Sequence, residues 1–353
     1  MARVLVIGAT GHLGAAVAHT FAAAGWQVRG YSRAGMPGGN LDGIAIEWRR
    51  GGSIEDAVAG CDVVVDAAAP YPVDPYLRGG PSNDVVATRA RERTERWLIA
   101  CADHRATFVG IGSFVTHRLR ERAGTPLRKR WLSQWIRGRH PYFAVKASIE
   151  DALLRAADRQ PVVVLNPTGC LGPYDLKEPR LALVPRLAEG SVPVAVPDVV
   201  DFIDARDVAL TALAALEQRA FGEPLLLAGH SRPFSTFIDA FCDELGCAAP
   251  ALRAPAVAGV PALVGAERVL GALGRPSPVP TLTVSIVLEC GAMERSDAQR
   301  ALGVPPRPLD ETVRDTVRWY RGPAYGARWP DALDRQRPNP GFGRRFFSLA
   351  SDR

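Results

Sequence analysis

The sequence has few cysteines, no long apolar run and no internal repeats, and each absence excludes a class of protein. Its six cysteines are scattered without a CxxC pair, so neither a zinc site nor a disulfide framework is indicated, and we expect a reduced, cytoplasmic protein. No segment approaches the roughly 18–20 uninterrupted apolar residues of a membrane span, so no transmembrane segment is expected. Because a predicted strand starts almost at the first residue, no signal peptide is expected either.

Acidic residues are scarce in residues 114–140, which we call the basic insertion, although the whole chain has a net charge of only +6. Glu121 is the only acidic residue of this segment. The basic residues are Arg118, Arg120, Arg122, Arg128, Lys129, Arg130, Arg137 and Arg139. The rest of the chain is near neutral, so nucleic-acid binding is not predicted.

The first stretch of the chain predicts a strand, a glycine turn and a helix. Residues 4–7 are short, apolar and β-branched, as in a buried strand, and the alanine-rich run to residue 24 favours a helix. Between them, glycine recurs at every third position. The first glycine allows a sharp turn, the second lets the backbone approach a pyrophosphate, and the third lets the helix pack closely on the strand. We therefore predict dinucleotide contacts from Gly8, Thr10, Gly11, His12, Leu13 and Gly14.

Strands and helices alternate through the first half of the chain. Strands are predicted at 27–31, 44–48, 62–66, 107–111 and 161–165, and helices at 53–58, 82–104 and 141–157. This alternation predicts an α/β fold, a Rossmann-type doubly wound parallel sheet with a smaller C-terminal substrate domain. We place the dinucleotide-binding domain at 1–168, with 194–220 returning to its sheet, and the mainly substrate-binding domain at 169–321. The tail, 322–353, is rich in Arg, Pro and Gly and is expected to be poorly ordered.

The end of the second predicted strand indicates the cofactor. A carboxylate there binds the ribose 2′-hydroxyl of NAD, whereas a basic residue accommodates the 2′-phosphate of NADP. The chain has Ser32 and Arg33, and no carboxylate follows until Asp42. We predict NADP(H) over NAD(H), with Arg33 and Ser32 at the phosphate; the alternative is that Arg33 is an ordinary surface residue. Ala68, among small residues after the fourth predicted strand, suits close approach of a cofactor, although helix–sheet packing explains it equally well.

Three polar residues have the order and spacing of an acid/base site. Tyr142 and Lys146 are four apart and therefore share one face of the helix predicted at 141–157. A lysine there lowers the pKa of the tyrosine from about 10 and can hydrogen-bond the nicotinamide ribose. Ser113 follows the strand predicted at 107–111, at the sheet edge where ligands of such folds bind. The alternative is an ordinary surface Tyr–Lys pair.

Taken together, these motifs resemble the extended short-chain dehydrogenase/reductases of the NAD-dependent epimerase/dehydratase family, with most similarity to the dihydroflavonol-reductase-like and 3β-hydroxysteroid-dehydrogenase-like branch. Further matching segments lie at 165–168, 171–173, 202–207, 222–227, 296–303 and 316–320, so the resemblance covers about residues 3–321. It implies that Ser113 orients a carbonyl, Tyr142 donates a proton and Lys146 holds the ribose. Residues near Ala68 and Pro167 are implied to line the cofactor. No metal is implied.

The chain departs from the family pattern at three places. Gly52-Ser53 stands where an Asp usually reaches the adenine, Asp66 stands where a His is usual, and Ala90 aligns with the family's helical Asn. These differences affect the adenine contacts and the proton relay but leave Ser113, Tyr142 and Lys146 intact.

Four other features have two interpretations each. His12 either touches phosphate or is an exposed loop residue, and His140 is more readily structural than part of the substrate pocket. The carboxylate pair Asp204 and Asp207 is expected to fix a turn and cap a helix. The basic insertion, with Trp131 and Trp135 among its charges, suits either a solvated substrate lid or, through residues 118–139, contact with an anionic membrane or acidic partner.

The sequence thus predicts an NADP(H)-dependent reductase of a ketone or aldehyde, or an alcohol dehydrogenase, acting on a small molecule. Residues 248–291 hold only five charged residues, which suits a hydrophobic substrate. The alternatives are a nucleotide-sugar epimerase or dehydratase and a non-catalytic NADP-binding sensor. The substrate, the physiological direction and the oligomeric state stay open.

Overall fold

The computed structural model describes residues 1–32, 39–68, 82–120, 140–177, 182–274 and 281–326. Its centre is a seven-stranded sheet in the order β10-β6-β5-β4-β1-β2-β3, and every neighbouring pair is parallel. The strands are β1 (Arg3–Ile7), β2 (Gln27–Ser32), β3 (Ile46–Arg50), β4 (Val63–Asp66), β5 (Thr107–Ile111), β6 (Val162–Pro167) and β10 (Pro224–Leu227). Since the strand order reverses beside β1, the β1–β4 crevice is the switch point at which ligands of such sheets bind.

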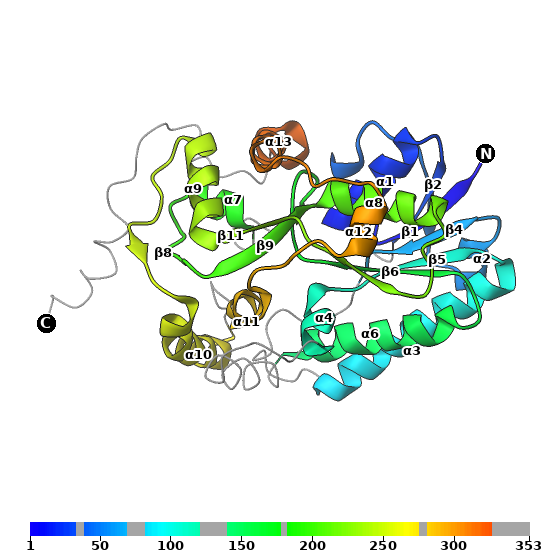
Figure 1. Ribbon diagram of the computed structural model, residues 1–353, viewed down its shortest axis with the longest axis horizontal. Coiled ribbons are helices and arrows are strands. Elements are labelled where there is room, and N and C mark those ends of the chain that lie inside the picture. Colours follow the sequence, from blue (N-terminus) through cyan, green and yellow to red (C-terminus); the bar gives the residue numbers. More distant parts are fainter. Residues whose placement is uncertain (33–38, 69–81, 121–139, 178–181, 275–280, 327–353) are drawn as a thin grey trace, which may run out of the picture.

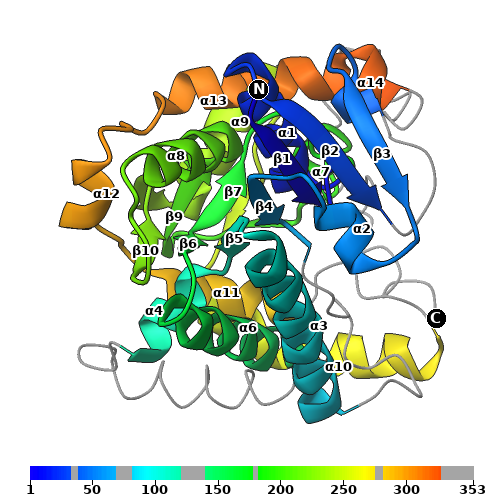
Figure 2. The same ribbon diagram turned by 90° about the vertical axis from the view of Figure 1, so that its right-hand side faces the viewer.

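Helices cover both faces of this sheet (Figures 1 and 2). One layer contains α1 (His12–Ala23) and α8 (Ala205–Glu217), and the other contains α2 (Ile54–Val58), α3 (Asn83–His104) and α6 (Pro141–Ala157). Successive residues of a strand point to opposite faces: Val4 and Val6 pack in the core with α1 and α8, whereas Leu5 and Ile7 pack in the core with α3 and α6. The predicted doubly wound Rossmann-type fold is therefore confirmed.

The second half of the chain forms smaller units beside the large sheet. The strands β7 (Gly169–Leu171), β9 (Val199–Asp204) and β11 (His230–Pro233) form one sheet, and β8 (Val194–Ala195) pairs with β12 (Leu252–Arg253). Around them lie α7 (Leu183–Ala188), α9 (Phe234–Leu245), α10 (Ala256–Ala272), α11 (Thr281–Cys290) and α13 (Leu309–Arg321). The short helix α12 (Asp297–Ala301) instead contacts β10 of the large sheet. Figure 1 shows α7, α9 and α10 at the end of the molecule opposite the N-terminus.

The predicted return of residues 194–220 to the large sheet is only partly right. Helix α8 packs against α1, but strand β9 lies in the small sheet, and the strand that joins β6 is β10. The reason is visible in β9, because its buried Asp201 needs hydrogen-bond donors. Thr168 Oγ1 (2.6 Å) and Ser231 Oγ (2.7 Å) supply them beside β9, whereas β10 presents buried leucines to the large core. The division into two domains stays a prediction.

The first residues of the predicted tail are ordered. Helix α14 (Pro323–Gly326) packs against the short 3₁₀ helix η1 (Gly39–Leu41), which precedes it by about 280 residues in the chain. Tyr325 is almost fully buried and donates a hydrogen bond to the carbonyl oxygen of Lys177 (2.8 Å). Residues 327–353 lie outside the described residues.

In the ranges that the structure describes, every helix is too short or too polar to span a membrane. In the same part of the chain, no group of His, Cys, Asp and Glu side chains is arranged to hold a metal ion.

Candidate active site

The glycine turn between β1 and α1 is shaped by backbone contacts. Gly8 has φ +78°, a left-handed conformation that favours glycine. A Cβ on Gly14 would lie 2.1 Å from the carbonyl oxygen of Gly8, so the helix could not pack this closely with any side chain there. Helix α1 begins after Gly11 without a side-chain cap. Its N-terminus therefore suits a phosphate, and this end of the sheet fits a dinucleotide.

The other predicted residues of the turn, Thr10, His12 and Leu13, are half-buried. The carbonyl oxygen of Thr10 accepts a hydrogen bond from Asn40 Nδ2 (3.0 Å), and Leu13 packs on the core beneath α1. The Nε2 atom of His12 is buried and has no hydrogen-bond partner among the described residues. Burial lowers the pKa of His12, while the nearby Asp175 opposes the shift. His12 is thus not an exposed loop residue.

The two residues predicted to contact the 2′-phosphate, Ser32 and Arg33, lie at the end of β2 and directly after it. Strand β2 ends at Ser32, whose backbone is described, and Arg33 lies outside the described residues. Both therefore stay predictions.

The end of β4 carries an ion pair between a buried carboxylate and a half-buried guanidinium, which the sequence patterns do not predict. Arg93 of α3 holds both carboxylate oxygens of Asp66, at 2.6 and 3.0 Å. The backbone N–H of Ala68 donates to the same carboxylate at 3.1 Å. A Cβ on Gly8 would lie 2.9 Å from the Cβ of Ala68, so the glycine turn and the end of β4 are in contact. This places Ala68 at the β1–β4 crevice, and its contact with a cofactor stays a prediction.

Ser113, Tyr142 and Lys146 come together at the end of β5. The hydroxyl oxygens of Ser113 and Tyr142 are 2.8 Å apart, within hydrogen-bond distance. The ammonium of Lys146 donates to the carbonyl oxygen of Ile111 at 3.2 Å. Burial lowers the pKa of Lys146 to about 8, and the negative charge of Asp66 opposes this shift. The arrangement can donate a proton to an oxygen atom placed against both hydroxyls.

Three buried residues adjoin Ser113 and were not singled out from the sequence. Asn166 Oδ1 accepts a hydrogen bond from the backbone N–H of Ser113 at 3.1 Å, and Thr116 and Glu150 bond with Asn166 in turn. A signal for one of them was present, because Glu150 follows Lys146 by four residues and continues the Tyr142–Lys146 face of α6. Pro167, the next residue after Asn166, ends β6 at the same edge of the sheet.

The surroundings of Tyr142 are apolar. Its ring packs in a cluster with Phe143, with residues of α4 (Phe114–Arg120) and with residues of α11, which lies in the region that the sequence analysis described as poor in charge. His140, just before α6, is buried, in agreement with a structural role. Residues 121–139 of the basic insertion lie outside the described residues, as do Trp131 and Trp135.

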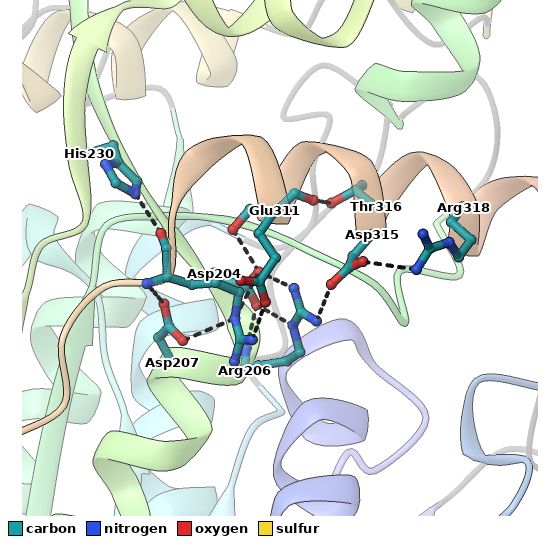
Figure 3. A network of polar contacts seen from close by, with 10 residues as sticks. Asp204, Arg206, Asp207, His230, Glu311, Asp315, Thr316 and Arg318 are labelled. Atoms are coloured by element: carbon teal, nitrogen blue, oxygen red, sulfur yellow. Dashed lines mark hydrogen bonds and ion pairs between the residues drawn. The ribbon is translucent and has the colours of Figure 1, made fainter. Parts of the chain in front are cut away.

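Asp204 and Asp207 form a structural network away from the acid/base group (Figure 3). Asp204 caps α8 by accepting the N–H of Arg206, and its carboxylate binds the Arg206 guanidinium at 2.7 Å. Asp207 accepts the N–H of Arg307 at 2.7 Å, and Arg206 also pairs with Asp315 of α13. The predicted capping role of Asp204 is confirmed, and the network fastens α13 to α8.

Comparisons with known proteins agree with this architecture. A model of the NAD dependent epimerase/dehydratase family matches residues 4–227. Sterol demethylase protein B of Methylococcus capsulatus is 27% identical over 340 residues, covering 90% of this chain and 98% of that protein. A putative dihydroflavonol 4-reductase of Synechocystis is 24% identical over 336 residues, covering 91% and 95%. The crystal structure of a nucleoside-diphosphate-sugar epimerase from Pseudomonas aeruginosa superposes with a TM-score of 0.65 at 20% identity, covering 91% and 97%.

Proposed function

Because the chain belongs to the NAD-dependent epimerase/dehydratase family, we propose that it is an NADP(H)-dependent oxidoreductase acting on a hydrophobic small molecule. It reduces a ketone or aldehyde, or oxidises the corresponding alcohol. The observation that carries this proposal is the 2.8 Å contact between the hydroxyls of Ser113 and Tyr142, beside a glycine turn suited to a dinucleotide.

In the proposed reaction, the nicotinamide supplies or accepts the hydride when the cofactor is bound. The hydroxyls of Ser113 and Tyr142 hold the substrate oxygen, and Tyr142 transfers its proton to that oxygen during reduction. Lys146 follows Tyr142 by one helical turn, and its positive charge stabilises the tyrosinate that remains. Gly8, Gly11 and the uncapped start of α1 would hold the pyrophosphate, and Ala68 and Pro167 would lie beside the cofactor.

The apolar packing around Tyr142 supports a hydrophobic substrate. Phe114 and Phe143 join it from the protein core, and Leu282 of α11 joins it from the second half of the chain. Two relatives carry names that refer to a sterol and a dihydroflavonol, which are both hydrophobic ring compounds.

A preference for NADP(H) is part of the proposal and rests on the sequence. The segment after β2 begins with Arg33, and no carboxylate that could bind a ribose 2′-hydroxyl follows until Asp42. Titration of the purified protein with NADPH and NADH, followed by fluorescence, tests this preference. Equal or tighter binding of NADH would exclude it, and Arg33→Ala should weaken NADPH binding selectively if the guanidinium meets the phosphate.

The main alternative is a nucleotide-sugar epimerase or dehydratase, which the likeness to a sugar-nucleotide epimerase structure keeps open. A non-catalytic NADP-binding sensor is a further alternative, which the assembled Ser113, Tyr142 and Lys146 disfavour. Screening NADPH oxidation against sterol, flavonoid, aliphatic and nucleotide-sugar ketones separates these functions. A reductase consumes NADPH with a ketone, whereas turnover of a nucleotide sugar without net cofactor consumption would favour the alternative.

We also propose a cytoplasmic location and a role for residues 118–139 in contact with an anionic substrate, acidic partner or membrane surface. The cytoplasmic location is supported by the six cysteines, which all lie among the described residues and form no disulfide. The contact is supported by the charge of the segment, which holds eight basic residues against one acidic residue. Changing Arg128, Lys129 and Arg130 together to Gln should raise the substrate KM or reduce co-sedimentation with anionic vesicles. If neither responds, these residues are only a solvated lid.

A further inference from the structure

Ser113 is held by hydrogen bonds on both sides of its backbone. Its N–H donates to Asn166 Oδ1 at 3.1 Å, and its carbonyl oxygen lies 2.8 Å from the hydroxyl of Thr116. The two partners come from different elements, Asn166 from β6 and Thr116 from α4. The carbonyl oxygen of Ser113 also accepts the backbone N–H of Thr116 at 3.1 Å, so the side chains of Asn166 and Thr116 add to the backbone contacts that position Ser113.

One carboxylate oxygen connects these two partners. Glu150 Oε2 lies 2.5 Å from the hydroxyl of Thr116 and 2.5 Å from Asn166 Nδ2. The amide of Asn166 is thereby oriented, because donation from Nδ2 to Glu150 leaves Oδ1 to accept the N–H of Ser113. These contacts form a closed ring that runs from Ser113 through Asn166, Glu150 and Thr116 back to Ser113, in which the single hydroxyl proton of Thr116 is donated either to Glu150 Oε2 or to the carbonyl oxygen of Ser113. We call these four residues the serine-holding ring.

The ring is buried and tightly enclosed. Each of its four residues is at most 4% exposed. A Cβ on Gly112 would lie 2.1 Å from Asn166 Oδ1, so the amide occupies space that is free only because residue 112 is glycine. Within a low-dielectric interior, hydrogen bonds between such groups are strong and hold their geometry.

Glu150 also belongs to the helix face that carries the acid/base group. Tyr142, Lys146 and Glu150 follow one another at intervals of four residues on α6, so a single helix positions all three. Lys146 donates a hydrogen bond to the carbonyl oxygen of Ile111. Glu150 acts through the ring on Ser113, which follows Ile111 by two residues. Helix α6 thus holds the Ile111–Ser113 segment at two points.

We infer that Glu150 is a positioning residue of the active site, which acts through Asn166 and Thr116 to hold Ser113 in hydrogen-bond distance of Tyr142. This inference rests on the proposed function for its effect on turnover, but the ring itself is a property of the protein without cofactor. Misplacement of a reacting group by about 1 Å can lower a rate roughly 100-fold, so loss of the ring should be visible in kcat.

A double-mutant cycle tests the inference. With a ketone found in the screen above, Glu150→Ala should lower kcat by roughly 10–100-fold per cofactor-binding site, and the Kd for NADPH should stay unchanged. In a Ser113→Ala background, Glu150→Ala should cause no further loss, because its effect passes through the serine hydroxyl. Gln299→Leu is the matched control: Gln299 is 2% exposed and makes two hydrogen bonds to Ala228, so its loss should lower stability without lowering kcat per site.

Thr116→Val provides a second variant should Glu150→Ala fail to fold, since valine keeps the volume of threonine without its hydroxyl. It should show the same dependence on Ser113. The inference would be overturned if folded Glu150→Ala and Thr116→Val keep the wild-type kcat. It would also be overturned if either substitution lowers kcat by the same factor with and without Ser113→Ala.

A measurement without substrate separates this inference from the proposed function. Measured against the β5 amides of the same protein, amide hydrogen exchange at Ser113 should be faster in Glu150→Ala than in the wild-type protein, while the destabilised control Gln299→Leu leaves this ratio unchanged. If the wild-type protein reduces no ketone but exchange responds as expected, the proposed function fails and the positioning of Ser113 stands. If exchange at Ser113 does not respond, the inference fails whatever the activity.

Discussion

The ammonium of Lys146 donates a hydrogen bond to the carbonyl oxygen of Ile111, two residues before Ser113, at a distance of 3.2 Å. The side chain is buried, and removal from water lowers its pKa from 10.5 to about 8. The negative charge of Asp66, the next largest influence, opposes this shift. Lys146 therefore changes charge close to neutral pH in the cofactor-free protein.

This shift predicts a pH dependence of stability. Between about pH 8 and pH 10.5 the unfolded chain binds the Lys146 proton and the folded chain does not, so the free energy of unfolding should rise with pH in this window. The full contribution is about 3 kcal/mol. Urea unfolding of the wild-type protein and of Lys146→Met, from pH 7 to 10.5 without cofactor, isolates it. Identical pH profiles for the two proteins would contradict the prediction.

Tyr142→Phe should reduce turnover by roughly 10²–10⁴-fold, because it removes the proton donor of the proposed reaction. Cofactor affinity should stay nearly intact. Tyr325→Phe is a suitable control, since it removes another buried hydroxyl, one that donates to Lys177 in the second half of the chain. Turnover on an identified ketone and NADPH affinity are measured for both variants. Wild-type turnover in Tyr142→Phe would show that the assigned mechanism is wrong.

Gly14→Ala should damage the glycine turn. The added Cβ would lie 2.1 Å from the carbonyl oxygen of Gly8, which is backbone and cannot move without shifting α1 from β1. We expect a loss of about 1–3 kcal/mol in stability and weaker dinucleotide binding. Gly265→Ala in α10 is the control, because no atom lies within 4 Å of the added methyl group and helix propensity favours alanine. Thermal unfolding and NADPH titration distinguish the two; equal behaviour would contradict the close-packing argument.

Arg93→Met should destabilise the protein by about 3–5 kcal/mol, because it leaves the buried Asp66 carboxylate without its bidentate partner. The double variant Asp66→Asn, Arg93→Met should recover part of this loss, since no buried charge then stands alone. Chemical unfolding of the two variants and the wild-type protein measures both values. A double variant that is less stable than Arg93→Met would argue against a buried unpaired charge as the cause.

Much of the fold follows from local sequence patterns. The strand at 107–111 and the helix at 141–157 have the bounds predicted for them, because a short β-branched run and a proline-started helix are decided by neighbouring residues. The glycine turn is local in the same sense, since the positive φ of Gly8 and the close packing of Gly14 involve residues six apart. The spacing of Tyr142 and Lys146 likewise needs only the period of one helix.

Local sequence patterns do not predict which strands pair in the second half of the chain. Strands β9 and β10 are both short and mostly buried, and neither sequence tells which of them lies beside β6. The choice is made by partners distant in the chain: the carboxylate of Asp201 finds Thr168 and Ser231 beside the small sheet. The same holds for α14, which contacts η1 and whose Tyr325 donates to the carbonyl oxygen of Lys177, both distant in the chain.

The sequence by itself thus determined the Rossmann-type architecture, the glycine turn and the identity of Ser113, Tyr142 and Lys146 as an acid/base candidate, because each depends on local conformation or on a single helical repeat. Tertiary structure alone decided how Ser113 is held. Asn166 is 53 residues from Ser113 and 50 from Thr116, and Glu150 is 34 from Thr116. Only the packing of α6 against the ends of β5 and β6 brings these buried polar groups together, where each must find a hydrogen-bond partner.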